Sequence, residues 1–262
     1  MVASTIHLPN LRKMFIPDPG YIIIECDLKQ ADAQFVAWEA DDPILKDVFR
    51  RRLDLHIENA KLIYGLDEYD PEKHAPLRQK AKVACHAANY LVGRKKLASV
   101  LGTNEAGADT FLRTWFRLHP GIKEWHERIK ENLDRTRTIS NPFGFRKFFF
   151  ERKQKALTEA VAWVPQSGVA IVTNKAWERI DDDLYPDVQV LLQVHDSLLM
   201  QVPESKFHAL APEIHRRMHI TVPYDDPLII PIDMKASDKS WGDCSKDFDP
   251  IVKELNSSFL TV

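Results

Sequence analysis

The spacing of apolar residues changes along this 262-residue chain, and the changes predict its elements. Residues 21–27 form a short apolar, β-branched run that ends in an acid, which predicts a buried strand. Residues 188–203 contain two apolar runs around a His-Asp-Ser tripeptide, which predicts a β-hairpin with a polar tip. Apolar residues recur at helical spacing over about 30–40, 43–66, 77–93, 95–137 and 156–180, with breaks expected at Pro120-Gly121 and Pro165. Residues 67–76 are rich in Pro and Asp and are expected to form a connector. A further helix is expected at about 204–219, and a strand at 228–235.

The overall composition is that of a globular protein, with 44% hydrophobic and 28% charged residues. No run approaches the ~18 apolar residues that span a bilayer, so we expect no membrane association. The 36 basic and 38 acidic residues give a net charge of −2, so nucleic-acid binding would depend on local basic patches. Cys26, Cys85 and Cys244 are far apart, which favours a reducing, cytoplasmic compartment over a disulfide framework or a zinc site.

Two acids are predicted at the ends of strands. Asp27 ends the first strand, Asp196 lies at the tip of the hairpin, and Asp32 follows Asp27 closely. Two carboxylates on rigid elements can hold a pair of divalent cations roughly 3.5–4 Å apart. The alternatives are that Asp27 only caps a helix and that the tripeptide is an ordinary tight turn.

The predicted helix over residues 77–93 carries a stripe of cations and rings. Arg78, Lys82, His86 and Tyr90 follow one another at i, i+4 steps and so share one face. Unpaired Arg and Lys are costly in a core, whereas this face suits a long anionic ligand with a flat end. The alternative is a solvated helix face.

A second basic segment lies at residues 145–155, where basic and aromatic residues alternate. Arg146 and Lys147 stand between phenylalanines, and Arg152, Lys153 and Lys155 follow. This segment is the best local candidate for contact with a nucleic-acid backbone.

Taken together, these segments resemble the polymerase domain of family A (DNA polymerase I-like) DNA polymerases, and bacteriophage forms most. Residues 26–34 (CDLKQADAQ) resemble motif A, usually D-Y-S-x-x-E-x-R, and residues 78–90 resemble motif B, R-x-x-x-K-x-x-x-[FY]-x-x-x-Y-G. Residues 194–197 (VHDS) resemble motif C, usually V-H-D-E. Residues 10–13 and 164–167 are similar to two further segments of the family, so the resemblance covers about residues 10–243.

The resemblance implies a role for each matching residue. Asp27 and Asp196 would be the catalytic acids that bind two Mg²⁺ ions, with Mn²⁺ as an alternative and the Leu28 carbonyl as a further ligand. Lys82 would be catalytic as well, because it could protonate the pyrophosphate leaving group. The nucleotide would contact Arg78, Lys82, His86, Tyr90 and Asp32, and DNA would contact Gln166, His195, Arg146 and Lys147.

The implied fold is α+β. The resemblance implies an antiparallel palm sheet at about 1–40 and 138–245, helical fingers at about 41–137, and a tail at 246–262. The partners would be primer–template DNA and dNTPs. No segment before residue 10 could form a thumb or a 3′–5′ exonuclease. We therefore expect either a C-terminal fragment or one subunit of a split polymerase, with those parts on a separate chain.

The chain departs from the family pattern at several positions, which leaves other functions open. Asp32 replaces the motif A glutamate that excludes the ribose 2′-hydroxyl, and Gln34 replaces the arginine. His86, Leu91 and Ser197 replace an aromatic residue, a glycine and a glutamate. The alternatives are a single-subunit RNA polymerase, a non-catalytic primer–template binding module, and a two-metal nuclease, which would leave the cationic stripe unexplained.

Overall fold

The structure of this protein is a computed structural model that describes residues 9–258, except for the side chain of Gln154. It divides into two units. The first contains residues up to 31, residues 169–222 and residues from 226 onward; the second contains residues 32–168 and 223–225. The predicted fingers, at about 41–137, cover a shorter range than this second unit. The assignment of the names palm and fingers to the chain stays a prediction. Residues 1–8 of the predicted palm and 259–262 of the predicted tail lie outside the described residues.

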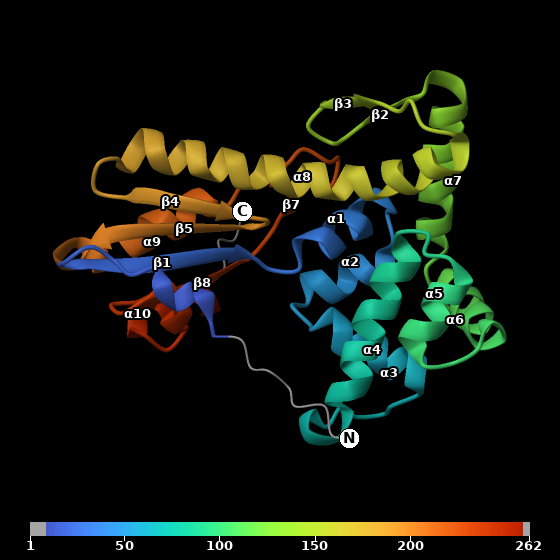
Figure 1. The fold of residues 1–262 in the computed structure, drawn as a ribbon, viewed down its shortest axis with the longest axis horizontal. Helices are drawn as coiled ribbons and strands as arrows, with labels where there is room; N and C mark the ends of the chain where they lie inside the picture. Colours follow the sequence, from blue (N-terminus) through green and yellow to red (C-terminus); the bar gives the residue numbers. More distant parts are fainter. Residues whose placement is uncertain (1–8, 259–262) are drawn as a thin grey trace. The chain divides into compact units, whose positions relative to one another are not determined.

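The first unit is built on a four-stranded antiparallel sheet of order β4-β5-β1-β8, which confirms the predicted α+β class (Figure 1). Its strands are β1 (Tyr21–Leu28), β4 (Gln189–Val194), β5 (Ser197–Pro203) and β8 (Ile232–Ser237). Ile23 and Ile24 of the central strand β1 are fully buried. The predicted β-hairpin is therefore present as β4 and β5, with its turn at residues 195 and 196.

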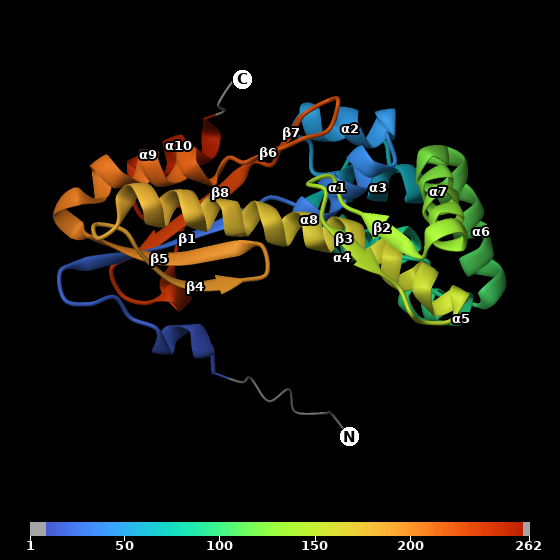
Figure 2. The same ribbon diagram turned by 90° about the horizontal axis from the view of Figure 1, so that it is seen from above.

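Helices cover one side of this sheet. Helix α9 (Phe207–Met218) contacts β1, β5 and β8, and α10 (Pro250–Ser257) packs on β8 and α9 (Figure 2). Short 3₁₀ turns lie at Leu11–Met14, Glu204–Lys206 and Trp241–Asp243, and β6 (Thr221–Val222) pairs with β7 (Leu228–Ile229). The C-terminal part of α8 (Lys153–Leu184) belongs to this unit.

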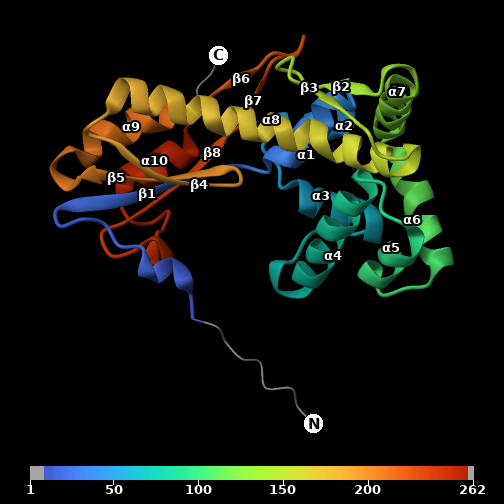
Figure 3. The ribbon, with the colours of Figure 1, turned by 45° about the horizontal axis from the view of Figure 1, so that its top comes forward.

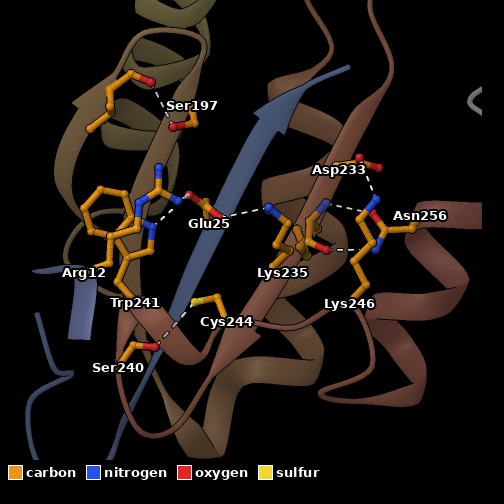
Figure 4. Close-up of polar contacts among 12 residues, drawn as sticks. Arg12, Glu25, Ser197, Asp233, Lys235, Ser240, Trp241, Cys244, Lys246 and Asn256 are labelled. Carbon is orange, nitrogen blue, oxygen red and sulfur yellow. Dashed lines mark hydrogen bonds and ion pairs between the residues drawn. The ribbon is translucent and has the colours of Figure 1, made fainter. Parts of the chain in front are cut away.

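A buried carboxylate ties the start of the described chain to the sheet. Glu25 of β1 is 5% exposed. It accepts hydrogen bonds from the Trp241 indole at 2.8 Å, the Lys235 ammonium at 3.2 Å and the Arg12 guanidinium at 3.3 Å (Figure 4). The Arg12 guanidinium also lies 4.4 Å from the centre of the Trp241 ring. These partners satisfy a charge that would otherwise be costly to bury.

The second unit is mostly helical (Figure 3). Its helices are α1 (Ala31–Glu39), α2 (Pro43–Arg50), α3 (Leu55–Tyr64), α4 (Pro71–Asn89), α5 (Arg94–Leu101), α6 (Glu105–Leu118), α7 (Pro120–Thr136) and the N-terminal part of α8. Asp or Asn side chains cap the first amides of α2, α3, α4 and α6, namely Asp42, Asp54, Asp70 and Asn104. Strands β2 (Thr138–Ser140) and β3 (Arg146–Phe148) form a small hairpin beside α7.

Buried aromatic and polar groups hold these helices together. Trp115 and Trp125 are each 2% exposed, as their helical spacing predicts. The buried imidazole of His119 lies 3.2 Å from the buried carboxylate of Asp42, which joins the end of α6 to the cap of α2. Near this point Gly121 of α7 allows a close approach, since a Cβ there would lie 2.4 Å from the Ala40 carbonyl oxygen.

Two helices differ from the sequence prediction. Residues 67–76 were expected to form a connector, but α4 already begins at Pro71, because Asp70 caps it and proline is favourable in a first turn. The helix ends at Asn89 and not at Gly93, with Leu91 in a left-handed conformation at φ 55°. Helix α8 continues through Pro165, where a break was expected. In residues 9–258 no helix is long and apolar enough to cross a membrane.

Candidate active site

The register of the first unit's sheet brings the two predicted acids together. Asp27, near the end of β1, pairs with Ser197 of β5, which directly follows Asp196 in the chain. The amide of Leu28 donates a 3.0 Å hydrogen bond to the backbone carbonyl of Asp196. Asp27 and Asp196, which are distant in the sequence, therefore lie on neighbouring strands at one end of the sheet.

The turn that carries Asp196 is tight. His195 has φ 54°, a left-handed conformation that His adopts more readily than most residues. The Ser197 hydroxyl donates to the Val194 carbonyl at 2.9 Å and closes the turn. His195 is exposed, and Asp196 is half-buried. Ser197 thus has a structural contact where the family pattern has a glutamate.

Electrostatics distinguish Asp27 from an ordinary surface acid. Burial raises the pKa of Asp27 to about 6, and the negative charge of Asp196 contributes in the same direction. The positive charge of Lys235 opposes this shift. Two carboxylates that repel each other in a partly desolvated place are suited to a divalent cation, which would relieve that repulsion.

A third acid lies opposite Asp27 but has other partners. Asp233 of β8 pairs with Asp27 in the sheet and forms ion pairs with Lys29 at 2.8 Å and Lys246 at 2.6 Å. Burial alone would raise the pKa of Asp233, but hydrogen bonds from Lys246 and Lys29 hold it below its usual value. Among the described residues no group of three or more His, Cys, Asp or Glu is arranged to hold a metal.

The second unit holds the predicted nucleotide-binding residues. Tyr90, at the C-cap of α4, donates a 2.5 Å hydrogen bond to the carboxylate of Asp32, and His86 Nδ1 lies 3.5 Å from the same carboxylate. The His86 and Tyr90 rings meet edge to face, with centroids 4.7 Å apart. Burial, and then the charge of Asp32, raise the pKa of Tyr90 well above its usual value. The short Asp32 side chain is thus fixed beside both rings.

The cationic part of the stripe has partners that the sequence analysis did not single out. The Arg78 guanidinium forms a 2.6 Å ion pair with Asp54, the N-cap of α3, while Lys82 is exposed. Burial lowers the pKa of His56 to about 4. The negative charge of Asp54 opposes this shift, whereas the positive charges of Lys82 and Arg78 add to it. His56 therefore faces the stripe as a neutral ring. Asp54 and His56 were not predicted from the sequence. The available sign was an Asp that can cap a helix, followed two residues later by a histidine.

The predicted DNA-binding residues are spread over several elements. Gln166 lies exposed on α8, and Arg146 lies exposed on β3. Lys147 points to the opposite side of β3 from Arg146 and forms a 2.6 Å ion pair with Glu159. His195 belongs to the turn of the first unit. The structure thus joins the predicted residues into two groups, one in each unit.

Comparison with known proteins identifies the family of this chain. The model of the family described as DNA polymerase family A matches residues 4–243. The chain belongs to DNA polymerase family A. This family A chain is 28% identical to the thermostable DNA polymerase I of Thermus filiformis over 91% of its own length and 29% of that protein's. It is 30% identical to DNA polymerase I of Deinococcus radiodurans over 85% of its own length and 24% of that protein's.

These relatives are bacterial and do not support the predicted resemblance to bacteriophage forms. The family A chain spans less than a third of the length of either. A solved structure, the POL domain of Pol1 from M. smegmatis in complex with DNA primer-template and dNTP, matches with a TM-score of 0.78 and 22% identity. The match covers 88% of this chain and 42% of that one, and it confirms the fold.

Proposed function

We propose that this family A domain synthesises DNA under the direction of a template, adding dNTPs to the 3′-hydroxyl of a primer. One observation supports the proposal most. In this member of the polymerase family, Asp27 pairs in the sheet with Ser197, the residue that directly follows Asp196. The proposed partners are primer–template DNA and dNTPs, such as the structural relative was solved with.

In this proposal Asp27, Asp196 and the Leu28 carbonyl hold two Mg²⁺ ions, with Mn²⁺ as an alternative. The donor chemistry fits, since magnesium takes few carboxylates and completes its shell with water and phosphate oxygens. When bound, such ions lower the pKa of a hydroxyl nucleophile and neutralise phosphate charge. Burial and then the charge of Asp196 raise the pKa of Asp27, and a bound cation would relieve the repulsion between the two acids.

The residues of α4 act on the nucleotide. The Arg78 guanidinium, oriented by Asp54, binds the triphosphate, and the exposed Lys82 ammonium protonates the departing pyrophosphate. His86 and Tyr90 line the pocket for the base and sugar. In this proposal Asp32, which accepts a hydrogen bond from Tyr90, selects against a ribose 2′-hydroxyl.

The remaining assignments follow the same proposal. Gln166, His195, Arg146 and Lys147 contact primer–template DNA. We assign the sheet-bearing segments at 1–40 and 138–245 to a palm and the helices at 41–137 to fingers. The three cysteines are free thiols, which supports a reducing, cytoplasmic location. A separate chain that supplies a thumb or exonuclease stays a prediction, tested by whether this chain extends primers alone.

Primer extension with an Asp196→Asn variant tests the proposal. The substitution removes one charge and keeps the side-chain shape, so we expect the fold to persist and extension to be lost. Asp187→Asn is the matched control, because Asp187 is a half-exposed acid near the same hairpin whose partner is Lys206. Primer extension by Asp196→Asn would refute the assignment. A wild-type chain that extends no primer with any supplied NTP or dNTP would refute it as well.

A further inference from the structure

The two outer edges of the four-stranded sheet differ in what covers them. At the β8 edge, the Asn256 side chain accepts a 2.7 Å hydrogen bond from the Met234 amide and donates one of 2.8 Å to the Met234 carbonyl (Figure 4). Two residues further on, Ala236 and Ser245 exchange both of their backbone hydrogen bonds. A further strand therefore cannot pair with the middle of this edge unless these bonds break.

The β4 edge has no such cover. Within residues 9–258, β4 pairs only with β5, and the backbone groups of residues 189–193 form no hydrogen bond outside that ladder (Figure 1). None of the six residues of β4 is buried, whereas the first six residues of β5 are. A row of unpaired amides and carbonyls on an exposed edge is a template for another extended strand.

The sequence of this edge lacks the usual protection against pairing. Edge strands are commonly blunted by charged side chains, lysine above all, or by proline. Residues 188–194 (VQVLLQV) contain neither a charge nor a proline, and Leu191 in their middle is 42% exposed. One bulge interrupts the ladder, where the register shifts between Val190 and Leu192, but the residues on both sides of it pair regularly.

The same segment is nearly symmetric about Leu191. When it is turned end for end and aligned on that residue, each position meets one of the same kind: Val188 meets Val194, Gln189 meets Gln193, and Val190 meets Leu192. One position further out, Asp187 meets His195, an acid opposite a basic ring. Apolar residues thus face apolar ones and no two like charges face each other, which favours antiparallel pairing of this strand with itself.

We propose that β4 is a docking edge for a second copy of this chain, and that two β4 strands pair antiparallel about Leu191 to join two sheets into one. A symmetric dimer requires a self-complementary patch, and this segment is one. Each β4 edge is then occupied and the β8 edge is covered, so the assembly closes at two copies. The inference involves neither DNA nor magnesium and does not depend on the proposed function.

The dimer is expected to be weak. The six residues of β4 span about 20 Å, and a strand of that length buries less surface than the ~1,600 Å² of a standard interface. The bulge at Leu191 twists the strand and weakens the pairing further. We therefore expect a dissociation constant of about 10–100 μM.

Sedimentation velocity of the intact chain, in EDTA and without DNA, measures this association over about 1–500 μM. The wild type should shift from one copy to two as its concentration rises. Leu191→Lys places two like charges face to face at the centre of the dimer and should weaken association by about tenfold or more. Leu62→Lys is the matched control, because it adds the same charge at a 45% exposed leucine of α3 and should leave association unchanged.

Charge reversal tests the symmetry of the pairing. Leu191→Glu alone should associate as poorly as Leu191→Lys, whereas an equal mixture of the two variants should associate again, because opposite charges then face each other. A variant that had merely lost its fold would not be rescued by the other, so the mixture separates loss of pairing from loss of structure.

Three results would overturn the inference: a wild type that stays a single copy at every concentration, a mixture that stays monomeric, and growth beyond two copies. The proposed function is tested separately, because Asp196→Asn should lose primer extension and still associate as the wild type does. Loss of one property without the other shows which idea has failed.

Discussion

Replacing Gly121 by alanine should destabilise the second unit, because α7 approaches the end of α1 too closely for a methyl group. The added Cβ would lie 2.4 Å from the Ala40 carbonyl oxygen and 3.7 Å from the Asp42 Cα. The first distance is far inside the ~3.5 Å at which such atoms attract each other. Because the obstacle is backbone, it cannot move aside by changing a rotamer. Asp42 and its buried partner His119 would be displaced together with it.

The expected magnitude follows from two opposing effects. Overpacking of this kind costs about 1–3 kcal/mol, and the preference of helices for alanine over glycine offsets at most ~1 kcal/mol. We therefore expect a net loss of about 1–2 kcal/mol, or roughly 2–8 °C in Tm for a chain of this size.

Thermal unfolding followed by circular dichroism measures this loss. Gly93→Ala is the matched control, since Gly93 has φ −67° at the N-cap of α5 and a Cβ there would meet nothing within 4 Å. The control should lose only about 0.5 kcal/mol, which is the preference for glycine over alanine at an exposed N-cap. A Gly121→Ala protein as stable as Gly93→Ala would show that α7 and α1 are less closely packed than the structure has them.

Three further predictions concern pH, sugar selection and metal. Burial, with the charges of His219 and Lys29, lowers the pKa of His215 to about 4. The unfolded chain binds this proton near pH 6.5, so the free energy of unfolding should fall by about 1–2 kcal/mol as the pH drops from 6.5 to 4; His215→Gln should flatten urea-melt stabilities across that range. Asp32→Ala removes the acceptor of Tyr90 and should raise NTP relative to dNTP incorporation by about tenfold in single-turnover assays; an unchanged ratio would exclude Asp32 from sugar selection. Mg²⁺ should raise the Tm of the wild type and EDTA should reverse it, whereas Asp27→Asn should show no such shift, and an equal shift in both would place the metal elsewhere.

The sequence predicted the sheet-borne part of the site better than the helical part. The run before Asp27 is short, apolar and β-branched, and two short apolar runs flank the tripeptide that contains Asp196, so both acids could be placed at strand ends. Their juxtaposition was inferred from resemblance, because strand order depends on long-range packing that no local pattern encodes. The pairing of Asp27 with the residue after Asp196 agrees with it.

The partners of the cationic stripe could not be predicted in the same way. The i, i+4 spacing correctly places Arg78 and Lys82 on one helix, but the Arg78–Asp54 ion pair joins different helices and depends on how α3 packs against α4. The start of α4 was missed because the Pro- and Asp-rich residues 67–76 were interpreted as a connector, whereas Asp70 followed by Pro71 is also a favourable helix start.

The position of the Asp27 carboxylate depends on the exact number of residues in the central strand β1. From residue 21 to residue 27 it is matched one to one with β5, and from residue 23 to residue 28 with β8. Side chains alternate along it, so inserting or deleting one residue between Tyr21 and Asp27 would turn that carboxylate to the reverse face and exchange the side chains packed on the two buried faces, such as Ile23 and Ile24. Length changes in evolution or engineering should therefore be tolerated in the hairpin between β2 and β3 long before they are tolerated in these few residues.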